Sequence, residues 1–116
     1  MDHDPVASIQ TLPAIALRGL TVFPNGLIHF DVGRAASIKA MEAAMAAGEP
    51  VFLVGQKDMT VERPERDDLY TVGTLSNVRQ ILRMPGDNVR VMVEGISRAR
   101  LRDVTQREPY LMAEIE

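Results

Sequence analysis

The 116-residue sequence contains no cysteine and no tryptophan, and only 4% of its residues are aromatic. The absence of cysteine excludes disulfides, thiolate nucleophiles and thiolate-bound metals, and it is consistent with a reducing compartment. The low aromatic content leaves few platforms on which nucleic-acid bases could stack. The sequence therefore favours neither a disulfide scaffold nor a cysteine enzyme nor a binder of single-stranded nucleic acid.

Long apolar runs are also missing. No segment approaches the roughly 20 apolar residues that a membrane span needs. The first residues, MDHDPVASIQT, are acidic, whereas an export signal begins with basic and then apolar residues. We therefore expect a cytoplasmic protein that makes no membrane contact. The formal charge of −3 also argues against a dedicated nucleic-acid binder.

Motifs for nucleotide binding and catalysis are absent as well. None of the 8 glycines is followed by lysine, so the chain lacks the phosphate-binding G-x-x-x-x-G-K-[ST] loop. Ser37 and Lys39 stand two positions apart on a predicted helix, where their side chains point in different directions and cannot form a dyad. Asp67-Asp68 has no partnering base, and His29 has only His3 as a metal-binding partner. We expect no enzymatic activity, cofactor or metal in this chain.

The second half of the chain has the alternating pattern of a β-sheet. Valines alternate with polar or long side chains over Val89–Glu94, which predicts a strand buried on one face. The preceding PGDN at 85–88 is typical of a tight turn. Val72–Met84 and Val89–Glu94 are therefore predicted to form a hairpin. Gly95 is predicted to break the chain before a third strand at Ser97–Val104.

Three shorter strands are predicted in the first half, at Leu12–Leu17, Leu27–Val32 and Val51–Val54. The last is apolar throughout, so it should be buried on both faces near the centre of the sheet. In the second of them, residues 28, 30 and 32 should point inward, because side chains alternate along a strand. This places His29 on the surface.

One helix is predicted at Ala35–Ala47, with Ile38, Met41 and Met45 as its buried stripe. Gly48 can adopt the left-handed conformation that ends a helix. On the opposite side of the helix, Lys39 and Glu42 are expected to pair.

The remaining segments connect or terminate these elements. Gln56–Asp68 is polar and is predicted to be a surface loop. A slip in the apolar phase over Val72–Ile81 predicts a bulge, which a sheet needs in order to curl. Pro109–Ile115 is predicted to be the last strand. Residues 1–10 are expected to form a flexible tail and residues 11–116 a single, mainly β (α+β) domain.

A basic stripe occupies one predicted face of the sheet and consists of Arg79, Arg90, Arg98, Arg100 and Arg102. We expect a solvated face on which these arginines pair with Glu94 and Asp103. RNA binding through the stripe is the alternative, and the negative net charge opposes it.

Several short motifs follow one another in a distinctive order along about nine tenths of the chain. They are Leu12-Pro13 with Leu17-Arg18, Pro24 after an aromatic residue, Val32-Gly33-Arg34, Glu42-Ala43-Ala44-Met45, Thr71-Val72-Gly73-Thr74, and Val93-Glu94-Gly95 followed by Arg98-Ala99. In this order and spacing, the chain resembles the N-terminal domain of bacterial Lon, the ATP-dependent protease. It departs from the common pattern at His29, where many members carry proline, and at Ala35 and Ala36, where many carry charged residues.

The resemblance implies a compact PUA-like pseudo-barrel of six to seven strands with one α-helix. It also implies a fragment of a longer homohexameric protein, in which a helical segment, an AAA+ ATPase using ATP and Mg, and a Ser-Lys protease domain follow. Such a domain would capture unfolded or damaged proteins for that machinery. No turn or capping signal closes the chain at Glu116, so we expect the natural polypeptide to continue. A stand-alone LON-domain interaction or assembly module is the alternative.

An unfolded polypeptide offers apolar side chains and unpaired backbone, which a curled sheet can receive at an open strand edge and a shallow apolar surface. The candidate substrate-binding residues are Leu20, Val22, Phe23 and Leu27 around a Pro24-Asn25-Gly26 turn, Arg34 and Lys39 as a charged rim, and Met84 and Pro85 at the hairpin tip. For the first four, a place in the ordinary core is the alternative.

Overall fold

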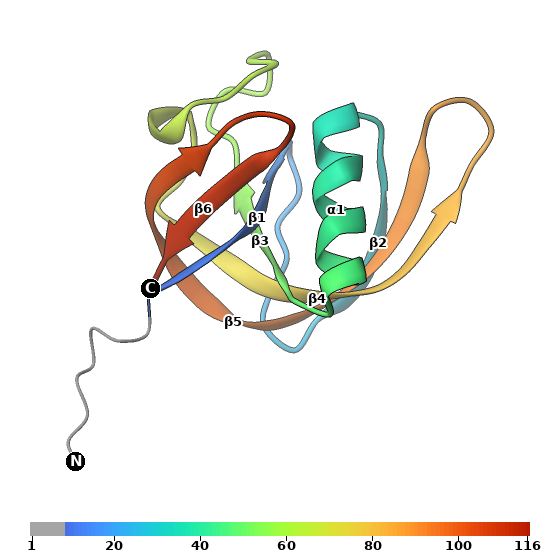
Figure 1. The fold of residues 1–116 in the computed structure, drawn as a ribbon, viewed down its shortest axis with the longest axis horizontal. Helices are drawn as coiled ribbons and strands as arrows, with labels where there is room; N and C mark the ends of the chain where they lie inside the picture. Colours follow the sequence, from blue (N-terminus) through green and yellow to red (C-terminus); the bar gives the residue numbers. More distant parts are fainter. Residues whose placement is uncertain (1–8) are drawn as a thin grey trace.

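The computed structural model describes residues 9–116 as a curled sheet with one α-helix beside it (Figure 1). The predicted tail lies mostly outside the described residues, as does His3. In chain order the elements are β1 (Gln10–Leu17), β2 (Leu27–Val32), α1 (Ala35–Ala47), β3 (Val51–Gly55), a short 3-10 helix (Arg66–Asp68), β4 (Val72–Arg83), β5 (Val89–Gln106) and β6 (Leu111–Ile115). Within residues 9–116, no helix has the length and apolar character to cross a membrane.

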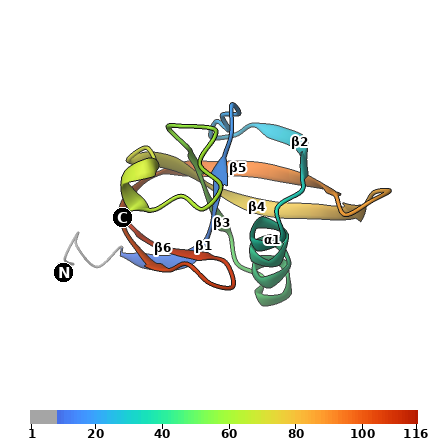
Figure 2. The ribbon, with the colours of Figure 1, turned by 90° about the horizontal axis from the view of Figure 1, so that it is seen from above.

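The strands follow the order β2-β5-β4-β3-β1-β6, and β5 has a third partner, β6. All pairs are antiparallel except β1 with β3. The sheet therefore curls until its C-terminal strand meets the far half of β5, with β4 and β5 on one side and β1 and β6 on the other (Figure 2). Within the described residues, the predicted mainly β fold with one helix is confirmed. It holds six strands in one sheet, and the sheet does not close into a barrel because β2 keeps a free edge.

β5 is a single strand of 18 residues, so the predicted break at Gly95 is wrong. A Cβ at Gly95 would stand 2.2 Å from the carbonyl oxygen of Phe23. The Gly95 N–H donates to the Gly26 oxygen at 2.8 Å, and the Asn25 N–H donates to the Gly95 oxygen at 2.9 Å. Gly95 therefore lets a turn that is distant in sequence approach the strand closely, and the strand continues through this glycine.

The predicted bulge in the long strand is confirmed. The pairing of β4 with β5 shifts register between Leu75 and Ser76 and again between Val78 and Gln80. Such shifts bend a strand and increase its twist. They help the hairpin of β4 and β5 to follow the curvature of the sheet.

Two apolar cores lie on opposite faces of β1 and β3, whose alternate residues point to different cores. The core nearer α1 comprises Ile15, Leu17, Val22, Val32, Ala40, Met41, Ala44, Val51, Leu53, Val89, Val91 and Val93. The core inside the curl comprises Leu12, Ala14, Ala16, Phe52, Val54, Leu69, Ala99, Leu101, Ala113 and Ile115. The prediction that Val51–Val54 is buried on both faces is therefore confirmed.

The helix has the predicted bounds, but its buried face differs from the predicted stripe. Ser37, Ala40, Met41 and Ala44 are buried, whereas Met45 is 41% exposed. Three of the four buried residues have small side chains, which let α1 approach the sheet closely, and the larger Met45 points toward solvent. The sequence does not show which face of the helix is buried, because alanine, its commonest residue, fits both buried and exposed positions.

The predicted end of α1 is confirmed, but the predicted pairing of Lys39 with Glu42 is not. Gly48 has φ 68°, in the left-handed region, and its N–H donates to the Met45 oxygen at 3.2 Å. Glu42 pairs with Arg83 of β4 at 3.1 Å rather than with Lys39.

Candidate functional site

An open groove of about 350 Å³ lies between the segment after β1, the loop after β3 and the start of β4. Three large apolar side chains along it face solvent: Met59 is 57% exposed, Tyr70 53% and Val72 47%. Single exposed apolar residues are common, but several lining one groove are typical of a binding surface. The predicted site residues Leu20 and Val22 line the same groove.

Tyr70 is fixed over the end of β3. Its N–H donates to the Gly55 oxygen at 3.0 Å, beside an isolated bridge between Gln56 and Leu69. Its ring lies against Gly55, where a Cβ would stand 3.0 Å from the ring Cδ2. The glycine therefore gives the aromatic ring its place in the groove.

The turn that carries Met59 is held by a buried glutamine, Gln56. Gln56 is only 4% exposed, and its Nε2 donates to the Asp58 oxygen at 2.8 Å and to the Val61 oxygen. The Asp58 carboxylate accepts hydrogen bonds from the Thr60 hydroxyl and N–H at 2.7 and 2.9 Å, which lower the pKa of Asp58. These contacts shape the loop residues 58–61 into a tight turn that presents the methionine.

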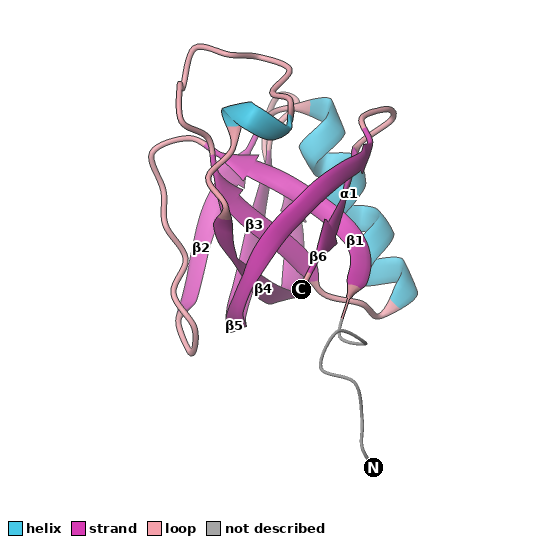
Figure 3. Ribbon diagram, turned by 90° about the vertical axis from the view of Figure 1, so that its left-hand side faces the viewer, coloured by secondary structure: helices cyan, strands magenta, loops and turns pink. Residues whose placement is uncertain are grey.

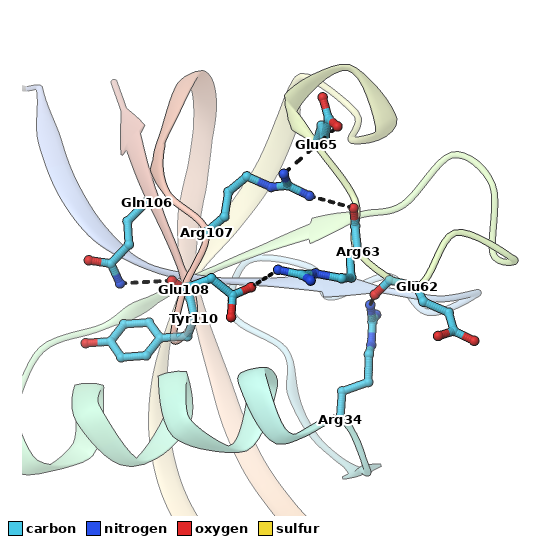
Figure 4. A network of polar contacts seen from close by, with 8 residues as sticks. All are labelled: Arg34, Glu62, Arg63, Glu65, Gln106, Arg107, Glu108 and Tyr110. Atoms are coloured by element: carbon cyan, nitrogen blue, oxygen red, sulfur yellow. Dashed lines mark hydrogen bonds and ion pairs between the residues drawn. The ribbon is translucent and has the colours of Figure 1, made fainter.

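The rest of this loop is tied to the turn between β5 and β6 (Figure 4). Arg63 pairs with Glu108, and Arg107 donates to the Arg63 oxygen at 2.9 Å and lies 4.0 Å from the Glu65 carboxylate. Exposed ion pairs contribute little stability each, typically less than about 1 kcal/mol. Together they connect this part of the loop to the turn between β5 and β6.

Arg34, a predicted rim residue, reaches inward from the start of α1. Its guanidinium donates to the Ala16 oxygen at 2.8 Å, to the Gln56 Oε1 at 3.3 Å and to the Glu62 oxygen at 3.3 Å. Burial and the nearby charge of Arg18 lower the pKa of Arg34. Arg34 thus joins β1 to the loop Gln56–Asp68, and within residues 9–116 its guanidinium contacts no carboxylate.

Of the predicted patch Leu20, Val22, Phe23 and Leu27, part is exposed and part is core. Phe23 is 60% exposed and Leu27 62%, and the Arg98 guanidinium lies 5.4 Å from the Phe23 ring centroid, a cation–π distance. Val22 is only 3% exposed, so the alternative of an ordinary core residue holds for it. The Thr74 hydroxyl donates to the Val22 oxygen at 2.7 Å and anchors the segment that carries Phe23.

The other predicted site residues lie elsewhere. Lys39 is exposed on α1, and the half-buried Met84 and exposed Pro85 form the tip of the β4–β5 hairpin. This tip projects to the side of the molecule opposite β6 (Figure 1). The eight predicted residues therefore do not form one site.

Three groove residues were missed by the sequence reasoning. Met59 is the one large unbranched apolar side chain in the polar loop Gln56–Asp68, and Tyr70 stands where that loop meets β4. An isolated large apolar residue in a polar loop is the signal that could have identified Met59. No local pattern shows that Val72 is exposed, because the alternation of a strand does not tell which face lies outside a curled sheet.

Among the described residues, three of the five arginines of the basic stripe pair with carboxylates. Arg79 pairs with Glu94 and Arg90 with Asp31 at 2.8 Å, and Arg102 lies 3.7 Å from the Glu114 carboxylate. The hydrogen bond from Arg90 lowers the pKa of Asp31. The predicted pairing with Asp103 is wrong among the described residues: the paired arginines of the stripe contact other carboxylates, and the Asp103 carboxylate accepts the Val104 N–H at 2.9 Å. In the part of the chain described, no three His, Cys, Asp or Glu residues gather as metal ligands.

Solved structures share this fold. The N-terminal domain of the Mycobacterium avium complex Lon protease superposes with a TM-score of 0.68 at 17% identity, over 92% of this chain and 54% of that one. A Lon N-terminal domain protein from Xanthomonas campestris gives 0.69 at 14% identity, over 92% of this chain and 59% of that one. The class of fold is therefore that of Lon N-terminal domains.

Comparison of the sequence with related proteins leads to the same family. A family model described as the ATP-dependent protease La (LON) substrate-binding domain matches residues 11–116. The Lon proteases of Clostridium acetobutylicum and Clostridioides difficile are 52% and 47% identical over 91% and 90% of this chain, which covers 14% and 13% of their lengths. Lon protease 1 of Bacillus subtilis is 37% identical over 92% of this chain and 14% of its own length. The chain belongs to the family of Lon substrate-binding domains, and the resemblance seen in its motifs is confirmed.

Proposed function

We propose that this chain captures unfolded or damaged proteins for a cytoplasmic, ATP-dependent Lon-type protease, and that the groove lined by Met59, Tyr70 and Val72 makes the contact. Membership in the substrate-binding family over residues 11–116 carries this proposal. In the proposal, ATP and Mg binding and Ser-Lys proteolysis belong to other domains of a homohexameric parent protein. This chain itself contributes recognition and no catalysis.

The groove suits a polypeptide whose sequence varies. Methionine adapts to partners of different shape because its side chain is flexible and polarisable, and tyrosine offers a broad apolar ring with a polar tip. Val72 adds a flat aliphatic surface beside them. Such a surface can bind many apolar segments without demanding one sequence.

A single copy of this domain should bind weakly. Ordering a flexible polypeptide costs a few kcal/mol, which offsets much of the gain from burying apolar side chains. Several copies in one oligomer would bind the same unfolded chain together and raise the apparent affinity, by about a hundredfold. Nanomolar binding of an unfolded protein by the monomeric chain would contradict this part of the proposal.

Substitution of groove residues tests the contact directly. We expect Tyr70→Ser and Met59→Ser each to weaken binding of a permanently unfolded, reduced and carboxymethylated model protein, with about a tenfold loss for Tyr70. The measurement is fluorescence anisotropy of the labelled model protein titrated with the chain.

Leu82→Ser is the matched control. Leu82 is a large apolar residue that is 46% exposed, and it lies on β4 outside the groove. Its substitution should leave the affinity unchanged. Equal losses for Leu82→Ser and Tyr70→Ser would show that general surface hydrophobicity, and not this groove, accounts for the binding.

A further inference from the structure

A second cavity, of about 530 Å³, opens between β1 and β2 on the side of the molecule toward the start of α1. Its walls include the half-buried apolar side chains of Leu20 and Phe30. Its rim carries two arginines, Arg18 and Arg34. The groove lined by Met59 and Tyr70 shares only Leu17 and Leu20 with it.

The edge of β2 that borders this cavity is open. β2 is the end strand of the sheet and pairs only with β5 among the described residues; Figure 3 shows it at the margin. The Gly26 oxygen points to β5, since it accepts the Gly95 N–H. In an antiparallel pair, successive residues alternate in the direction of their backbone groups. The N–H and C=O groups of Leu27, His29 and Asp31 therefore point away from β5.

On the facing edge of β1, one backbone acceptor is already occupied. Beyond Ala14, β1 has no further pairing with β6, and the Ala16 oxygen on that side accepts the hydrogen bond from Arg34. An incoming backbone therefore finds its unpaired partners on β2. An open strand edge beside an apolar cavity is the geometry in which an extended polypeptide adds as a further strand.

The charge at this cavity is unbalanced. Among the described residues, the Arg34 guanidinium donates only to neutral oxygens, and the one hydrogen bond of the Arg18 guanidinium goes to the Val61 oxygen at 3.3 Å. Asp31 lies at the rim, but Arg90 compensates its charge. Within residues 9–116, these two guanidinium groups have no carboxylate partner, in a chain whose formal charge is −3. They are complementary to a carboxylate.

We propose that the cavity between β1 and β2 binds an extended polypeptide segment that pairs with the open edge of β2 and places an aspartate or glutamate side chain between Arg18 and Arg34. This inference rests on the proposed function and adds a preference to it. Apolar segments that carry an acidic residue are selected over those that carry none. Leu20 and Phe30 receive the apolar side chains that flank the acid.

Two short labelled peptides test this preference with the full chain. Both alternate valine and threonine; one carries a central glutamate and the other glutamine. We expect the glutamate peptide to bind about tenfold more tightly, and Arg18→Gln to abolish the difference. Arg100→Gln, at an exposed arginine outside the cavity, should preserve it. Equal binding of the two peptides, or a preference that survives Arg18→Gln, would overturn the proposal.

Strand addition is tested separately with His29→Pro, which removes an N–H that faces away from β5. We expect both peptides to bind several-fold more weakly, while thermal unfolding shows that the fold persists; unchanged binding would overturn the pairing with β2.

C-terminal amidation of the peptide should have no effect, because an internal strand is bound, and a loss on amidation would contradict the proposal. If unfolded protein still depends on Tyr70 while glutamate confers no preference, this inference fails and the proposed function stands.

Discussion

Gly95→Ala should destabilise the domain through one close contact. A Cβ at this position would stand 2.2 Å from the Phe23 carbonyl oxygen and 3.3 Å from the Cα of Pro24. Real Cβ atoms do not approach backbone this closely, so the turn at residues 23–26 must move away from β5. That movement breaks the two backbone hydrogen bonds that join the turn to Gly95.

The expected cost follows from these contacts. Forcing an additional carbon into a packed site costs about 1–3 kcal/mol. Loss of the two hydrogen bonds adds about 1 kcal/mol each. We therefore expect the free energy of unfolding to fall by about 3–5 kcal/mol, a large part of the roughly 5–15 kcal/mol that a domain has.

Urea unfolding followed by circular dichroism measures this loss, and Gly86→Ala is its control. Gly86 has φ 82°, and a Cβ there would meet no atom within 4 Å, so alanine at this position encounters only backbone strain. That substitution should cost about 1 kcal/mol. A loss below about 1 kcal/mol for Gly95→Ala, or equal losses for the two variants, would refute the assigned role of Gly95.

The buried polar groups of β4 and one exposed ion pair give further expected outcomes. Thr74→Val should lower the free energy of unfolding by about 1–2 kcal/mol in urea unfolding, because the buried Val22 oxygen loses its donor. Ser76→Ala should leave that free energy unchanged or raise it, because within residues 9–116 the buried Ser76 hydroxyl has no hydrogen-bond partner. Arg90→Gln should raise the pKa of Asp31 in an NMR titration. Because that pKa is lowered in the folded state, the contribution of Asp31 to stability is present above pH about 4 and is lost as the pH falls through the folded-state pKa.

Local patterns predicted most of the elements. Alternation over Val89–Glu94 and the apolar run Val51–Val54 report burial directly, and Gly48 marks the end of α1 by its own conformation. The role of Gly95 could not be predicted in this way. A glycine that admits a backbone distant in sequence has the same local appearance as a glycine that breaks a strand.

The candidate site was harder to predict than the fold. The groove joins the segments 17–22, 53–59 and 70–74 with Arg98, and none of these segments carries a motif that indicates binding. Phe23 was identified because it adjoins a turn, whereas Val22, one position earlier, belongs to the core. Which side of a curled sheet faces solvent depends on strand pairings that are remote in sequence.

The most direct test of polypeptide capture is a backbone NMR titration of the chain with the unfolded model protein. The account predicts that the largest chemical-shift changes fall on Met59, Tyr70, Val72 and their neighbours along the groove. Changes confined to the hairpin tip at residues 84–88, or no changes at saturating concentrations of the unfolded protein, would contradict it.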